Sequence, residues 1–121
     1  MQEYQSLIDA LFKLPFVRYA VVSDSFGKRL AGGMKPGVQT YSSRQTETKL
    51  EIQAVLILKM AEEFEPQHGR LFYGAVRWQK VVALFFLLSQ DQVVTITVEG
   101  DTPLQEGFNV EALIHGWRAA H

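Results

Sequence analysis

The longest helix that this sequence predicts has more apolar surface than one contact can cover. It spans residues 43–64. Ser43 can cap its start, because the hydroxyl can accept a hydrogen bond from a first-turn N–H group, and Pro66 prevents its continuation. A helix that packs on one face of a sheet needs a single apolar stripe. Here two rows at helical spacing are rotated away from each other. The first row is Leu50, Ala54, Ile57, Ala61 and Phe64, and the second is Ile52, Val55, Leu56 and Met60.

Two arrangements would cover both rows. The helix is either sandwiched within its own domain, beneath the terminal helices or the connection at residues 32–41, or covered by a second copy of the chain. We predict that the second copy covers the second row. The chain is then a homodimer.

Composition limits the class of protein. At 121 residues the chain has the usual size of one domain, so we expect residues 1–121 to form a single domain. The absence of cysteine excludes disulfides and thiolate metal sites and fits a reducing compartment. A net charge of −1 with mixed signs lacks the basic footprint of a nucleic-acid-binding protein. The longest apolar run, residues 81–88, is too short for membrane insertion, and the N-terminus does not resemble a signal peptide. We therefore expect a cytoplasmic protein.

Hydrophobic periodicity predicts an order of helix, two strands, long helix, three strands and a final helix. Residues 102–105 resemble a capping box before the final helix, which Asn109 is expected to cap. The other elements are a helix over residues 2–14, strands over residues 16–23 and 28–31, and strands over residues 70–77, 80–89 and 92–99.

The strand at residues 80–89 decides the layering. Its sequence VVALFFLL is apolar on both faces, so it must lie inside a sheet that is covered on both sides. We predict an α+β fold with a five-stranded antiparallel sheet, the long helix on one face and the terminal helices on the other. The strand at residues 70–77 then lies at the sheet edge, which invites pairing with another chain. The predicted dimer interface is Ile52, Val55, Leu56, Lys59, Met60, Phe72, Tyr73 and Val76.

The segment PFVRYAVVSDSFGKRLAGG and the element order resemble the Roadblock family, of the dynein light chain type, within the profilin-like and longin-like group. In that family a strand ending in a small polar residue and Asp leads through a turn with Gly to a short strand ending in Ala. The element order matches over residues 3–118. The matching residues are Val17, Ala20, Val21, Val22, Asp24, Gly27, Leu30 and Ala31.

The resemblance implies a non-enzymatic module for dimerisation and scaffolding. Members of the family commonly pair through the long helix and the adjacent strand, and many bind or regulate small Ras-like GTPases in motor or signalling assemblies. It implies no cofactor. For Asp24 and Gly27 the residues themselves favour a structural turn, because Asp can bond the backbone ahead of it and Gly can take a positive φ.

Few residues suggest chemistry. The three histidines, His68, His115 and His121, lack the spacing of metal ligands, and we expect no metal site. The glycine-rich segment at residues 32–37 does not match a phosphate-binding loop, and no serine has the setting of a nucleophile. Arg77 and Trp78, at a hairpin tip, are candidates for contact with a partner protein, and a role for Trp78 in covering the core is an equal alternative.

Two other functions remain open. Five-stranded antiparallel sheets with flanking helices also occur in small-ligand sensors of the PAS and GAF type. In such a sensor, apolar side chains would line the pocket. A profilin-like binder of actin-like proteins is a third interpretation, based on fold analogy alone. The candidate pocket residues are Tyr19, Phe72, Phe85, Phe86 and Trp117.

Overall fold

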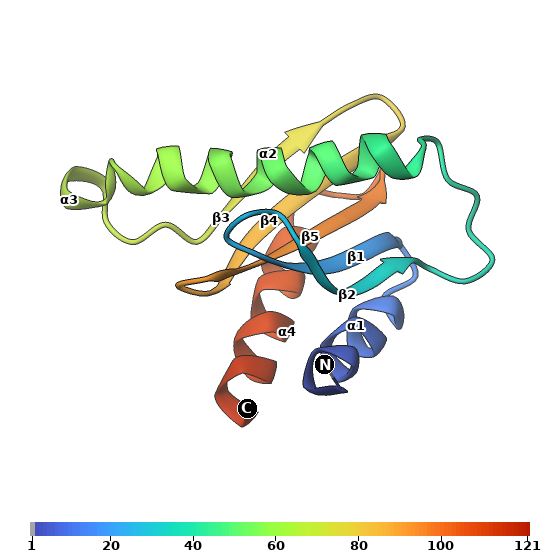
Figure 1. Cartoon of the computed structure of the whole chain (residues 1–121), viewed down its shortest axis with the longest axis horizontal. Helices are drawn as coiled ribbons and strands as arrows, with labels where there is room; N and C mark the ends of the chain where they lie inside the picture. Colours follow the sequence, from blue (N-terminus) through green and yellow to red (C-terminus); the bar gives the residue numbers. More distant parts are fainter. Residues whose placement is uncertain (1) are drawn as a thin grey trace.

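The computed structural model describes residues 2–121 and shows an antiparallel sheet between two helical layers (Figure 1). As predicted, the long helix α2 lies on one face, and the terminal helices α1 and α4 lie on the other. The elements are α1 (Gln2–Phe12), β1 (Val17–Asp24), β2 (Arg29–Met34), α2 (Arg44–Glu62), α3 (Glu65–His68), β3 (Tyr73–Arg77), β4 (Val81–Ser89), β5 (Gln92–Glu99) and α4 (Glu106–Ala120).

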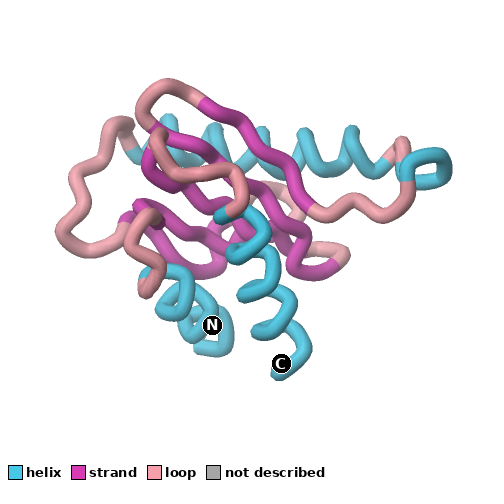
Figure 2. The backbone as a smooth tube through the Cα atoms, turned by 180° about the vertical axis from the view of Figure 1, so that it is seen from behind, coloured by secondary structure: helices cyan, strands magenta, loops and turns pink. Residues whose placement is uncertain are grey.

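The strands are arranged in the order β2-β1-β5-β4-β3, and every neighbouring pair is antiparallel. The apolar strand β4 pairs with both β5 and β3, so it lies inside the sheet as its two-sided pattern predicts. Strands β2 and β3 are the two edges, and α2 connects them. After β2, a loop at residues 35–43 runs along the side of the sheet to the start of α2 (Figure 2).

Each face of the sheet has its own apolar core. The larger core lies beneath α1 and α4, and the smaller one lies beneath α2. Because side chains alternate along a strand, β4 contributes to both cores, with Phe86 in the larger and Phe85 in the smaller. The buried side chains of the smaller core are Ala54, Val55, Leu58, Ala83, Phe85 and Val93.

Helix α2 begins as the sequence predicts. The Ser43 hydroxyl accepts a hydrogen bond of 3.2 Å from the Thr46 N–H group. The helix ends at Glu62, two residues earlier than predicted, because the chain turns into the short helix α3 with Pro66 in its first turn. Phe64, which we predicted in the inward row, therefore lies beyond the helix, where it is exposed and stacks on His68.

Other boundaries also differ from the prediction. Helix α1 ends at Phe12, and β3 begins only at Tyr73. The prediction that Asn109 caps the last helix is wrong, because α4 begins at Glu106 and the Asn109 side chain donates to the Glu106 carboxylate within the first turn. The capping box at residues 102–105 does not form, since the buried Thr102 hydroxyl has no hydrogen-bond partner in the described chain.

Strand β2 is longer than predicted because glycine lets it approach β1 closely. Gly32 has a φ of +99°, and a Cβ atom there would lie 2.1 Å from the Ala20 carbonyl oxygen. Glycine is the residue that tolerates both conditions. The β1–β2 turn is held by Asp24, whose carboxylate accepts N–H bonds from Phe26 at 2.9 Å and Lys28 at 3.0 Å, while Gly27 takes a φ of +83°.

Candidate functional site

The outward surface of α2 carries the largest exposed apolar side chains of that helix. Ile52, Leu56 and Met60 follow one another at intervals of four residues, so they form one line along the helix. They are 42%, 54% and 64% exposed, respectively. We call these three residues the α2 stripe. An exposed apolar line of this kind on a helix is typical of a contact surface.

The inward surface of α2 differs from the prediction in one respect. Leu58 belongs to neither predicted row, yet it is buried between Ala54 and Val55 against the sheet. Val55, which we predicted to contact a second subunit, is only 4% exposed. Its side chain is buried within its own protomer, so it cannot be part of an outward interface. The physical reason is that the sheet contacts the side of α2 that lies between the two predicted rows. The other three residues of the second row, Ile52, Leu56 and Met60, therefore stay exposed.

Within residues 2–121, the edge strand β3 presents backbone N–H groups that have no hydrogen-bond partner. The Trp78 N–H donates to the Val81 carbonyl at 2.8 Å across the β3–β4 hairpin. Because antiparallel strands alternate between bonded and non-bonded positions, the N–H groups of Tyr73, Ala75 and Arg77 point away from β4 to the open edge. The side chain of Ala75, in the middle of the strand, is exposed. This edge can accept another strand.

The predicted interface residues on this strand lie on different faces. Phe72, just before β3, is 61% exposed. Tyr73 is turned towards α4, where its ring stacks on Phe86 with 5.1 Å between ring centroids. Val76 faces α2 and packs, partly buried, against the smaller core. Lys59 is exposed on α2.

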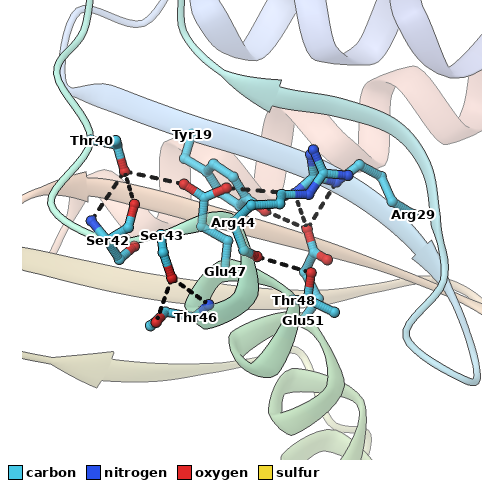
Figure 3. Close-up of polar contacts among 10 residues, drawn as sticks. All are labelled: Tyr19, Arg29, Thr40, Ser42, Ser43, Arg44, Thr46, Glu47, Thr48 and Glu51. Carbon is cyan, nitrogen blue, oxygen red and sulfur yellow. Dashed lines mark hydrogen bonds and ion pairs between the residues drawn. The ribbon is translucent and has the colours of Figure 1, made fainter.

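A buried polar cluster connects the start of α2 to β1 and β2 (Figure 3). Glu51, 1% exposed, accepts hydrogen bonds from the Tyr19 hydroxyl and from Arg29, whose Nη2 lies 2.7 Å from Oε1. Arg29 Nε adds a second bond of 3.1 Å to the same oxygen, and its Nη2 also contacts the Tyr19 hydroxyl at 2.6 Å. Glu47 lies 3.9 Å from Arg29. The buried carboxylate of Glu51 is thus both charge-paired and hydrogen-bonded, as a buried ion requires.

The cluster favours one protonation state for Tyr19 and one for Arg29. Burial, followed by the hydrogen bond to Glu51, raises the pKa of Tyr19 far above its ordinary value of 10.0, so the phenol stays neutral. Burial alone would lower the pKa of Arg29, but the bond to Glu51 and the neighbouring charges of Glu51 and Glu47 give a net increase. The guanidinium therefore remains charged, and the Tyr19 phenol remains neutral near neutral pH.

Sequence reasoning did not find this cluster. Glu51 lies between two apolar rows of α2 and looks like a solvent-facing residue, while its partners are on strands 22 and 32 residues away. The only signal in the sequence is the helical spacing of Glu51, Val55 and Leu58, which marks the inward seam. A charged residue in a buried seam requires a partner of opposite charge, and Arg29 is that partner.

An open groove of about 340 Å³ lies beside the first half of α2. Its walls include two half-exposed aromatic side chains, Tyr41 from the loop after β2 and Trp78 from the β3–β4 hairpin. Arg18, at its base, donates to the Glu99 carboxylate and to the Gln39 carbonyl, and its guanidinium carbon lies 4.3 Å from the centre of the Tyr41 ring. We call this the Trp78 groove. Its further lining includes Met34, Lys49, Leu50 and Val81.

The remaining predicted residues do not form a site. Arg77 bonds the Gly100 carbonyl at 3.3 Å, next to the groove residue Trp78. His115 pairs with Glu111 at 3.6 Å, and His121 stacks on Trp117. Within residues 2–121, no group of three or more histidine, aspartate or glutamate side chains is placed to hold a metal ion.

The sensor pocket proposed from the sequence does not exist as one cavity. Phe85 lies in the smaller core, whereas Phe86 and Trp117 belong to the larger core on the opposite face of the sheet. Phe72 is exposed. Phe85 and Phe86 point to opposite faces of the sheet because neighbouring residues on a strand alternate, so the five aromatic residues cannot line one cavity.

Comparison with solved structures identifies the fold. The Roadblock/LC7 domain from Streptomyces avermitilis superposes with a TM-score of 0.70 at 10% identity, covering 95% of this chain and 94% of that one. The chain has the Roadblock/LC7 fold. The gliding protein MglB from Thermus thermophilus gives a TM-score of 0.70 at 12% identity over 99% of this chain and 91% of its own. An MglB structure with a tetrameric arrangement gives 0.72 at 13% identity over 98% and 90%. No family model and no curated protein matches the sequence.

Other features of this Roadblock/LC7 fold add detail. On the side of the sheet opposite to α2, Leu104 and Phe108 are exposed at the start of α4. Across residues 2–121, no helix combines the length and apolar character that would be needed to cross a membrane.

Proposed function

We propose that residues 1–121 form one Roadblock-like domain that works as a homodimeric, non-enzymatic interaction platform. The observation that carries this proposal is the α2 stripe, three large apolar side chains that their own protomer leaves exposed. Burying them against a second copy would remove from water an apolar surface that stabilises association by about 25 cal/mol per Å² before the costs of association. The tetrameric arrangement of one MglB supports self-association in this fold.

The edge strand supports the same dimer. Two copies of β3 that pair in antiparallel fashion around Ala75 would satisfy the free N–H groups of Tyr73, Ala75 and Arg77 in each copy. Such a two-fold interface uses the same surface on both subunits. It would join the two five-stranded sheets into one and bring the α2 stripes together on the same side. This is the pairing that the family resemblance implies.

The composite sheet and paired helices would then present a surface to another protein. The resemblance to the Roadblock family implies a small Ras-like GTPase or a larger assembly as that partner, and a cytoplasmic location. Tyr19 and Arg29 of the buried cluster keep their protons near neutral pH, so neither serves as a general base there. We assign this cluster to holding β1, β2 and α2 together.

Size-exclusion chromatography with light scattering tests the dimer. The unaltered chain should have twice the mass of its 13.7 kDa protomer at micromolar concentration. Leu56→Asp should give a monomer, because it places a charge at the centre of the interface without affecting the core. Gln5→Asp is the control: it adds the same charge at an exposed position of α1, which packs on β1 and β2 at the end of the sheet away from β3, so its variant should stay dimeric.

A proline variant separates the strand contribution from the helix contribution. Ala75→Pro removes an N–H group that points to the open edge, while the bonded positions of the β3–β4 pair keep their donors. We expect this variant to be a folded monomer or a weakened dimer by the same measurement. A monomeric unaltered chain at high micromolar concentration, with an unchanged mass for both variants, would refute the dimer.

A further inference from the structure

The Trp78 groove has the dimensions and lining of a small-molecule site. Its volume of about 340 Å³ lies at the lower end of the range of ligand pockets, about 300–1,000 Å³. Tyr41 and Trp78 offer two aromatic surfaces to a flat apolar group, and Leu50 and Val81 add aliphatic surface. The groove is not part of the α2 stripe, since none of the three stripe residues lines it.

The charges around the groove favour an anion. Two acidic groups beside it are already occupied, because Glu99 pairs with Arg18 and Glu47 lies close to Arg29 and accepts from the Thr40 hydroxyl. Lys49 lines the groove, and Lys80 Nζ lies 5.3 Å from the centre of the Tyr41 ring. Neither lysine belongs to an ion pair in the described part of the chain. The unpaired charge at this rim is therefore positive.

Tyr41 is held in place for such a contact. The Arg18 guanidinium and the Lys80 ammonium both lie against its ring, at 4.3 Å and 5.3 Å from the centroid. Cation–π contacts of this kind orient an otherwise exposed aromatic side chain. Arg18 is itself fixed by Glu99 and the Gln39 carbonyl. One aromatic wall of the groove is thus organised before any ligand arrives, which reduces the entropy lost on binding.

We propose that the Trp78 groove binds a small amphipathic anion, with a flat apolar body between Tyr41 and Trp78 and its acidic group near Lys49 and Lys80. None of the three α2-stripe residues lines this groove, and its wall residue Trp78 directly follows Arg77, the last β3 residue of the proposed strand pairing. The sensor pocket considered from the sequence lay elsewhere and shares only Tyr19 with this groove.

Two dyes with the same apolar body separate the contributions of shape and charge. Anilinonaphthalene sulfonate is the anionic probe, and phenylnaphthylamine is its uncharged counterpart. The chain has two tryptophans, so Trp117→Phe leaves Trp78 as the sole indole reporter. We expect the sulfonate to quench Trp78 fluorescence in a saturable manner, with one probe bound per protomer. Calorimetric titration of the unaltered chain with the same two dyes gives the affinity without any tryptophan substitution.

The decisive variant is Lys49→Gln with Lys80→Gln. Removing two exposed charges should weaken sulfonate binding roughly fivefold and leave phenylnaphthylamine binding within about twofold. Lys13→Gln with Lys28→Gln removes the same charge from exposed positions outside the groove, and it should leave sulfonate binding unchanged. Trp78→Ala should weaken the binding of both dyes, as measured by calorimetry.

The dimer variant Leu56→Asp distinguishes this proposal from the proposed function. Sulfonate binding that is unchanged in Leu56→Asp supports the groove whether or not the chain is a dimer. Binding that is lost in Leu56→Asp but kept in the lysine variant would place the dye on the α2 stripe and overturn the proposal. Quenching of Trp78 that occurs only in Leu56→Asp would show that a second copy covers the groove, which also overturns it. The proposal would also be overturned if the groove variant and the control variant, each lacking two lysines, lost the same affinity for both dyes.

Discussion

The two faces of the sheet are covered in different ways. Beneath α1 and α4 the packing is apolar, with buried side chains from both helices meeting strands β1, β4 and β5. Beneath α2 the apolar core is smaller, and part of the buried volume is taken by the Tyr19–Arg29–Glu51 cluster. The outer side of α2 then exposes the α2 stripe, and its first half borders the Trp78 groove.

This difference separates stability from recognition. A buried ion cluster adds little net stability compared with an apolar replacement, but it fixes the geometry of the elements that it joins. Here it joins the first half of α2 to two strands, while Val55 and Leu58 attach the second half of the helix. The helix is therefore held in a defined position from which its outer surface can contact a partner. The α1/α4 face, in contrast, supplies the larger share of the buried apolar surface.

The largest expected effect separates the two sides of α2 itself. Leu58 and Leu56 are the same residue type two positions apart, one buried at 1% exposure and the other exposed. Leu58→Ala should lower the free energy of unfolding by about 3 kcal/mol, since it leaves a cavity against the sheet. Leu56→Ala should change protomer stability by less than about 0.5 kcal/mol. Urea unfolding followed by circular dichroism at low protein concentration measures both, and equal losses would contradict the assignment of faces.

An intermediate effect is expected in the buried cluster. Glu51→Gln keeps the volume of the side chain but leaves the Arg29 charge without its closest partner, so the free energy of unfolding should fall by about 2 kcal/mol. Glu63→Gln, at the exposed residue directly after the same helix, is the control and should be near neutral. Chemical denaturation at pH 7 measures the difference. A neutral Glu51→Gln would mean that Glu47 alone is able to hold Arg29.

The smallest effect concerns pH. The folded state raises the pKa of Tyr19 above 10.0, so its contribution to stability is fully present below pH 10. As the pH rises above 10, the phenol ionises in the unfolded chain but not in the folded one. The free energy of unfolding therefore falls, by at most about 1.4 kcal/mol per pH unit from this group. Tyr19→Phe should make the decline between pH 10 and 11 shallower, and an unchanged slope in denaturant titrations would contradict the raised pKa.

The sequence by itself determined the layers. The apolar strand at residues 80–89 required cover on both faces. The apolar spacing over residues 2–14 and the cap at Ser43 placed two of the helices, and the two rows on the long helix predicted surface left over for a partner. These features are local, because periodicity and capping depend on residues a few positions apart.

Only the tertiary structure decided which side chains the long helix buries. The direction in which the sheet contacts α2 placed Val55 and Leu58 inside and left Ile52, Leu56 and Met60 exposed. It also brought Glu51 to Arg29 and Tyr19, and Trp78 to Tyr41, from segments far apart in the chain. No local sequence pattern predicts these long-range contacts, since they depend on the order of strands and on the rotation of the helix about its axis.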